Sequence, residues 1–62
     1  MEEKDFLHID DIMNILHVGR NKAYKLVRRN DFPKIKIGRK YLIPRIDFEK
    51  FMKRFIYKEL KI

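Results

Sequence analysis

The first apolar pattern along the chain has the period of an α-helix. Its residues recur three and four positions apart and so fall on one face of a helix. They are Ile9, Ile12, Met13 and Leu16. We expect a helix from about Ile9 to Leu16, with Asp10 and Asp11 in its first turn, where the helix dipole favours negative charge. His8 precedes it in place of the Ser or Thr of a capping box, so its start is weakly capped.

A second helix is expected from about Arg20 to Arg29, separated from the first by only His17-Val18-Gly19. Three residues between two short helices is the spacing of a helix-turn-helix motif. His17 is expected to adopt a positive φ where the chain bends back. Gly19 can cap the second helix without a side-chain oxygen. Asn30 is expected in the left-handed position that follows a helix end.

The stretch KIKIGRKYLIP predicts a β-hairpin, because two short runs of β-branched and aromatic residues flank Gly-Arg-Lys. Side chains alternate along a strand, so burying the apolar ones on a single face fixes the register. That face would hold Ile35, Ile37, Tyr41 and Ile43. Ile37 then lies opposite Tyr41, which requires a three-residue loop, Gly38-Arg39-Lys40. Lys36 and Leu42 would point outward.

The strongest helical pattern begins after Pro44 and supplies much of the expected core. Its apolar stripe is Phe48, Phe51, Met52 and Phe55. Beyond Phe55 the pattern drifts, so the chain is expected either to fray over residues 57–62 or to expose a partner-binding tail. That tail comprises Ile56, Tyr57, Leu60 and Ile62. The expected fold class is mainly α with one small antiparallel β-hairpin, in the order α-α-β-β-α.

The chain has 62 residues, the length of one domain, so we take residues 1–62 as a single unit with residues 1–5 flexible. It has no cysteine and therefore neither a disulfide nor a thiolate metal site. No apolar run is long enough to cross a bilayer, and the acidic start, MEEKDF, is unlike a signal peptide. We expect a small cytoplasmic protein, complete as it stands.

The net charge of +7 is concentrated in the middle third of the chain. Residues 1–18 carry one lysine against five acidic residues, a net of −4. Residues 19–40 carry nine cationic residues against one acidic residue, a net of +8, and residues 41–62 have a net of +3. Such a concentration indicates a polyanionic partner. We favour nucleic acid; an anionic membrane, an acidic protein and simple solvation are the alternatives.

The second predicted helix differs in chemistry between its two sides. Ala23, Leu26 and Val27 mark the side that faces the core. The outward and flanking positions are Arg20, Asn21, Lys22, Tyr24, Lys25, Arg28 and Arg29. They include no acidic residue, whereas a merely solvated helix usually mixes both signs. Asn can pair with adenine, and Arg or Lys with guanine, while the same cations also bind phosphates. We interpret this face as one that reads DNA; a solvated face is the alternative.

The predicted hairpin tip continues the basic surface. Its candidate DNA-contacting residues are Lys36, Gly38, Arg39 and Lys40. Gly38 supplies backbone freedom at the tip. Arg39 could enter a narrow minor groove, where the negative potential is enhanced, or grip phosphate.

No catalytic residue, metal site or cofactor is expected, and we do not expect an enzyme. His8 and His17 lack a supporting cluster of acidic or sulfur ligands. Tyr24, Tyr41 and Tyr57 each lack a neighbouring base. The basic amphipathic segment 48–62 could lie on a membrane, but we prefer a core-facing helix, since the small domain otherwise has too little apolar area.

Five short motifs follow one another in order. They are a Leu-x-Ile-x-Asp-Ile opening, an Ala-Tyr-Lys-Leu-Val helix, Phe-Pro, Ile-Gly-Arg-x-Tyr-x-Ile and a closing Asp-Phe-x-x-Phe. From Phe6 to Met52 the chain thereby resembles the small helix-turn-helix domains of the excisionase group, which are related in fold to the DNA-binding domains of mercury-resistance-type regulators. The resemblance implies a winged helix-turn-helix. Its second helix would enter the major groove, and its wing would contact the minor groove or the backbone.

The resemblance also implies a biological role, that of a recombination directionality factor. Such a protein binds and bends double-stranded DNA and assists an integrase in excising a phage or mobile element. A small transcriptional regulator using the same surface is the first alternative, and a protein- or membrane-interaction module built on the last helix is the second. We expect a monomer in solution that assembles cooperatively on DNA.

Three positions depart from the pattern of that group. His8 replaces the usual Thr or Ser before the first helix, and His17-Val18-Gly19 replaces a Gly-Val-Ser turn. Met13 replaces a small residue between the helices. These departures are expected to weaken capping or helix packing while leaving the DNA-facing chemistry intact.

Overall fold

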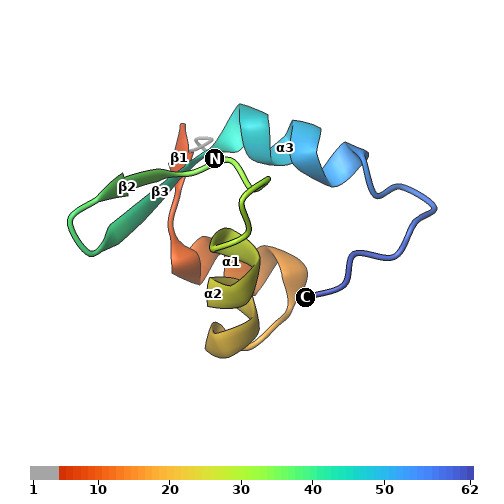
Figure 1. The fold of residues 1–62 in the computed structure, drawn as a ribbon, viewed down its shortest axis with the longest axis horizontal. Helices are drawn as coiled ribbons and strands as arrows, with labels where there is room; N and C mark the ends of the chain where they lie inside the picture. The colour runs from red at the N-terminus through yellow and green to blue at the C-terminus, as the bar shows by residue number, and fades with distance from the viewer. Residues whose placement is uncertain (1–4) are drawn as a thin grey trace.

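The computed structural model describes residues 5–62, which form three helices and a three-stranded antiparallel sheet (Figure 1). The elements in chain order are β1 (Phe6–Leu7), α1 (Ile9–Leu16), α2 (Arg20–Val27), β2 (Ile35–Ile37), β3 (Lys40–Pro44) and α3 (Arg45–Lys53). The predicted order α-α-β-β-α is confirmed. A short strand, β1, precedes it and was not predicted.

Helix α1 has the predicted bounds, and its apolar stripe faces the core. Ile9 and Ile12 are buried, and Met13 packs against the core in spite of its size. The weak start expected at His8 is compensated by Asp11, whose carboxylate accepts a hydrogen bond of 2.9 Å from the His8 backbone N–H. At the other end, His17 has a φ of 55°, which confirms the predicted left-handed bend.

Helix α2 begins at Arg20 with Gly19 as its N-cap, as predicted, but it ends two residues early, at Val27. The chain then turns through hydrogen bonds between backbone groups, from the Arg29 N–H to the Leu26 carbonyl (3.1 Å) and from the Phe32 N–H to the Arg29 carbonyl (3.2 Å). The prediction of a left-handed Asn30 is wrong. Among the described non-glycine residues, positive φ occurs at His17 and Tyr57.

The predicted hairpin is present, but its predicted register is wrong. Ile37 pairs with Lys40 instead of Tyr41, so the loop is Gly38-Arg39 and not three residues long. Gly38 has a φ of 59°, which suits the first loop position of a type II′ turn. This tight turn matches the twist of the paired strands, and its local preference overrides the apolar alternation on which the prediction rested.

The shifted register decides which face each β2 side chain occupies. Opposed residues share a face, so Lys36 joins Tyr41 on the inner face and Ile35 joins Leu42 on the outer face. The predicted outward Lys36 is therefore wrong, and its ammonium nitrogen lies 6.0 Å from the centroid of the Tyr41 ring. The predicted burial of Ile35 and Ile37 is wrong too, since they are 44% and 55% exposed.

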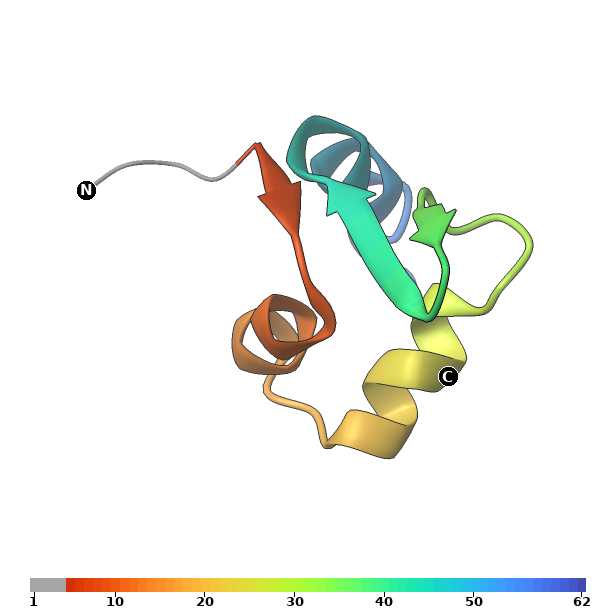
Figure 2. The same ribbon diagram turned by 90° about the vertical axis from the view of Figure 1, so that its left-hand side faces the viewer.

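Strand β1 adds a third strand to the sheet. It pairs antiparallel with β3, opposite β2, and Figure 2 shows β1 (red-orange) and β2 (green) on the two sides of β3. Leu7 lies opposite Ile43, and both are buried. Residues 1–5 were expected to be flexible, and residues 1–4 of this range lie outside the described residues. The carbonyl of Asp5 accepts a 3.0 Å hydrogen bond from the Arg45 N–H.

The core lies where the sheet, α1, α2 and α3 meet. Its fully buried side chains are Ile12, Ala23, Leu26, Val27 and Ile43. Phe32, just after α2, packs against two rings of α3, with centroid distances of 6.0 Å to Phe48 and 5.0 Å to Phe51. The predicted core-facing stripe of the last helix is confirmed. Its final member, Phe55, lies beyond the helix end and still packs against the core.

The chain after α3 turns back toward the end of α2. Two successive turns follow the helix. The Phe55 N–H donates a hydrogen bond to the Met52 carbonyl (3.0 Å), and the Lys58 N–H donates one to the Phe55 carbonyl (2.9 Å). The Arg29 guanidinium donates a 3.1 Å hydrogen bond to the Lys61 carbonyl, and Leu60 packs against the core. The C-terminal segment is therefore attached to the domain at two points.

Candidate nucleic-acid interface

Burial of one side of α2 fixes the direction in which the other side points. Ala23, Leu26 and Val27 are all fully buried, as predicted. A helix repeats every 3.6 residues, so the residues on the opposite side must face solvent. The exposed residues of this side are Asn21, Lys22, Lys25 and Arg28. The predicted basic, hydrogen-bonding ridge is thus presented to solvent.

Tyr24 connects this helix to the hairpin. It is half-buried, and its ring meets the ring of Tyr41 edge to face, with 6.4 Å between the centroids. The Arg28 guanidinium carbon lies 5.4 Å from the centroid of the Tyr24 ring. A ring face attracts a cation and restricts its motion. Arg28 is therefore partly ordered before any ligand binds.

The hairpin presents its cations at a narrow tip. Arg39 occupies the second loop position, Lys40 opens β3, and both are exposed. The loop residue Gly38 is also exposed, and a Cβ added to it would meet no atom within 4 Å. Lys36 is exposed as well, but it lies on the inner face beside Tyr41 and away from the tip.

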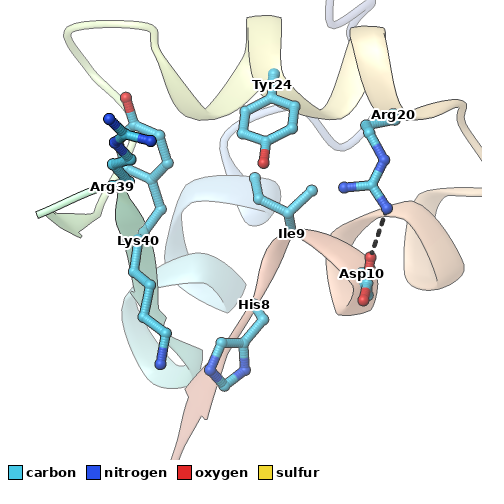
Figure 3. A pocket seen from close by; sticks show the side chains of 8 residues that line it. His8, Ile9, Asp10, Arg20, Tyr24, Arg39 and Lys40 are labelled. Atoms are coloured by element: carbon cyan, nitrogen blue, oxygen red, sulfur yellow. Dashed lines mark hydrogen bonds and ion pairs between the residues drawn. The ribbon is translucent and has the colours of Figure 1, made fainter. Parts of the chain in front are cut away.

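A hollow of about 200 Å³ lies between the hairpin, the start of α2 and the start of α1 (Figure 3). We call it the cleft. It is lined by His8, Ile9, Asp10, Arg20, Tyr24, Arg39, Lys40 and Tyr41. Figure 3 places Arg39 and Lys40 on one side of the cleft and Arg20 on the other. Cations on two facing sides of a concave surface suit a polyanionic backbone that passes between them.

Asp10 and His8 are cleft residues that sequence reasoning missed. An oxygen of the Asp10 carboxylate lies 3.3 Å from a terminal nitrogen of Arg20, and both side chains are largely exposed. The signal available in the sequence was the three-residue turn. It folds α2 back on α1, so a residue near the start of α1 can meet one at the start of α2.

Arg29, which was predicted to contact DNA, does not line the cleft. It follows α2, and its guanidinium donates two 2.9 Å hydrogen bonds to the Asp31 carboxylate. Those hydrogen bonds lower the pKa of Asp31 from its ordinary value and raise the pKa of Arg29. The guanidinium carbon also lies about 6 Å from the ring centroids of Phe51 and Phe55. Arg29 links the end of α2 to α3 and to the C-terminal segment.

The predicted partner-binding tail is divided. Leu60 packs against the core, while Ile56, Tyr57 and Ile62 are exposed. Tyr57 is 103% exposed and has a φ of 67°, an unusual conformation for a bulky residue. Ile56 also borders an apolar groove of about 400 Å³ between α1 and α3, which includes Ile15 and Met52. Figure 1 shows the hairpin loop and this C-terminal segment at opposite ends of the molecule.

Residues 5–62 contain neither a membrane-spanning helix nor a cluster of metal-ligating side chains. None of the helices there is both long and apolar enough to cross a membrane. No group of three His, Cys, Asp or Glu side chains in that range could hold a metal ion.

Two helices joined by a three-residue turn, followed by a hairpin and a third helix, define a winged helix-turn-helix fold. The model of the helix-turn-helix domain family matches residues 6–55, which span every element described above. The chain belongs to this family, which includes excisionase-like DNA-binding proteins. No curated protein and no solved structure matches the chain significantly. Membership implies that the protein binds DNA.

Proposed function

We propose that this protein is a sequence-specific DNA-binding and DNA-bending accessory factor of the excisionase type, which assists an integrase in excising a phage or mobile element. The observation that carries the proposal is the cleft, where Arg20 of α2 lies across from Arg39 and Lys40 of the hairpin. The proposal also draws on the resemblance to the excisionase group.

In this proposal α2 lies in the major groove, whose width admits an α-helix. Asn21, Lys25 and Arg28 project from its exposed side toward base edges. Arg39 and Lys40 extend from the hairpin, acting as the wing, to the neighbouring minor groove or its phosphates. A protein that contacts both grooves gains contact area when the duplex bends toward it, which gives bending a physical reason.

The protein contributes binding energy in this scheme, and the integrase supplies the chemistry of strand exchange. Asp10, the carboxylate of the cleft, is paired with Arg20. The protein would act in the cytoplasm as a monomer that assembles cooperatively on DNA. The exposed Ile56 and Tyr57, in the segment after α3, are the proposed contact with the integrase.

A transcriptional regulator could use the same surface at a promoter. Deleting the gene separates the two roles: lost excision of the native element supports the accessory factor, and altered transcription with normal excision supports the regulator.

The DNA-binding part of the proposal is tested by measuring affinity for duplex DNA over a range of salt concentrations. With roughly six phosphate contacts, log K should fall with log salt with a slope of about −5. Energy transfer between dyes at the two duplex ends would reveal bending in the same samples. Weak, salt-independent binding to every duplex would refute the proposal.

A further inference from the structure

We propose that Asp10 is a specificity-determining residue that limits binding to arbitrary DNA by holding Arg20; this inference rests on the proposed DNA-binding function. Asp10 is the carboxylate of an otherwise cationic cleft (Figure 3). Its oxygen lies 3.3 Å from a terminal nitrogen of Arg20, the first residue of α2.

The fold has little need of this ion pair. The side chains of Arg20 and Asp10 are 59% and 76% exposed, and an ion pair so open to water contributes little to stability. The start of α1 is already satisfied by Asp11, which accepts the His8 N–H. Beyond the favourable position of its charge near the start of α1, Asp10 adds little to the stability of the fold. Because it lines the cleft, it acts chiefly on whatever enters the cleft.

The pair makes the contribution of Arg20 conditional. Arg20 can bind a phosphate only by giving up Asp10, and a phosphate must approach closely to replace a direct, charge-assisted hydrogen bond. In a complex held by base contacts, α2 is seated in the groove and its first turn reaches the backbone. In a complex with arbitrary DNA no base contact seats the helix, so Arg20 stays with Asp10 and the carboxylate repels nearby phosphates.

Binding to arbitrary DNA depends almost entirely on phosphate contacts. Withholding one cation therefore removes a larger share of that binding than of binding at the preferred sequence. Asp10 would lower affinity everywhere but lower it most where base contacts are absent. Its effect is to widen the ratio between the two affinities.

The experiment compares Asp10→Asn with the wild-type protein on two duplexes, one of random sequence and one selected by the wild-type protein from a random pool. On the random duplex, D10N should bind about fivefold more tightly, the size of a close charge interaction in water. Its salt slope should steepen by about 0.9, which corresponds to one more phosphate contact. On the selected duplex the gain should be clearly smaller.

Asp47→Asn is the matched control. Asp47 is an exposed aspartate in the first turn of α3, as Asp10 is in α1, but it does not line the cleft. D47N makes the same charge change with the same loss near a helix N-terminus. D47N should bind both duplexes slightly more tightly than the wild-type protein, and by the same factor. Thermal denaturation of both variants would confirm that they are folded.

Arg20→Ala tests the route of the effect. R20A should weaken binding to the selected duplex more than to the random one, and adding D10N to R20A should give much less than the fivefold gain. Equal effects of D10N and D47N, with wild-type binding intact, would overturn the role of Asp10 alone. Weaker binding of D10N to the selected duplex would overturn it too, because Asp10 would then position Arg20. Salt-independent binding by the wild-type protein would overturn the proposed function itself.

Discussion

Helix α2 and strand β2 are held in place by different forces. Helix α2 buries three side chains completely in the core, Ala23, Leu26 and Val27. Strand β2 buries none: all three of its residues are exposed, and it is held by pairing with β3 and by the turn at Gly38. Helix α2 is thus positioned by apolar burial, and β2 by strand pairing and turn geometry.

This difference separates stability from binding. Removing apolar volume beneath α2 should damage the fold and the DNA-binding surface together. Changes on β2 or at its tip should alter binding while leaving the core intact. Exposed positions on β2 can therefore be varied with little effect on the stability of the domain.

The largest effect is expected for Leu26→Ala, on the buried side of α2. Leu26 is fully buried, and truncating a buried leucine costs about 2–5 kcal/mol because it leaves a cavity. A domain of this size has little stability to lose, so L26A should be largely unfolded at 37 °C. Chemical denaturation followed by circular dichroism measures the change in the free energy of unfolding.

Ile37→Ala is the control from β2. Ile37 is as apolar as Leu26 but 55% exposed on β2. It should lose less than about 0.5 kcal/mol, as surface substitutions usually do. Similar losses for I37A and L26A would mean that β2 too is held by apolar burial, which would contradict the comparison.

The sequence predicted α2 better than the wing for the same physical reason. Helix orientation follows from the positions of its buried side chains, which a helical pattern reveals. Ala23, Leu26 and Val27 therefore identified the core side correctly. The bounds of α2 were less certain, because Arg28 and Arg29 have good helix propensity and the turn that ends the helix depends on contacts made by Phe32.

The hairpin register could not be read from apolar alternation. Two rules competed, burial of Ile35 and Ile37 on one face and a tight turn at Gly38, and the turn prevailed. Strand β1 is only two residues long, so it shows no alternation at all. The approach of Asp10 to Arg20 depends on the angle between α1 and α2, which sequence spacing does not specify.

An intermediate effect is expected on DNA recognition by α2. If Arg28 contacts a base, Arg28→Ala should lose about 1–3 kcal/mol at the preferred sequence and relax the choice of base at one position. Arg28→Lys is the matched control, since it keeps the charge but loses the planar fork. Asn21→Ala should behave like R28A. Selection of preferred sites by each variant from a random pool measures the change.

The wing should respond differently. Arg39→Ala should weaken binding to selected and random duplexes by similar factors and make the salt slope shallower by about 1, as expected for a lost phosphate contact. An Arg28→Ala protein with unchanged base preference would show that Arg28 binds only phosphate. A loss for R39A that depends on the minor-groove width of the duplex would place Arg39 in that groove.

The smallest effect is expected on stability at acid pH, through the Arg29–Asp31 ion pair. Hydrogen bonds from Arg29 lower the pKa of Asp31, so the folded state binds the carboxylate proton less readily than the unfolded chain does. The stabilisation is therefore present above the ordinary aspartate pKa near 3.8 and is lost as the pH falls through the lower, folded-state value.

Asp31→Asn removes this acid-sensitive contribution. At pH 7 D31N should melt slightly below the wild-type protein, and the difference should shrink as the pH is lowered below about 3.8, where wild-type Asp31 also becomes protonated. Glu59→Gln, a neutralised carboxylate in the exposed C-terminal segment, should show no such convergence. A gap that stays constant from pH 7 to pH 2 would contradict a contribution from the Asp31 charge. No gap at any pH would mean that Arg29 holds the segment through its contact with the Lys61 carbonyl and not through Asp31.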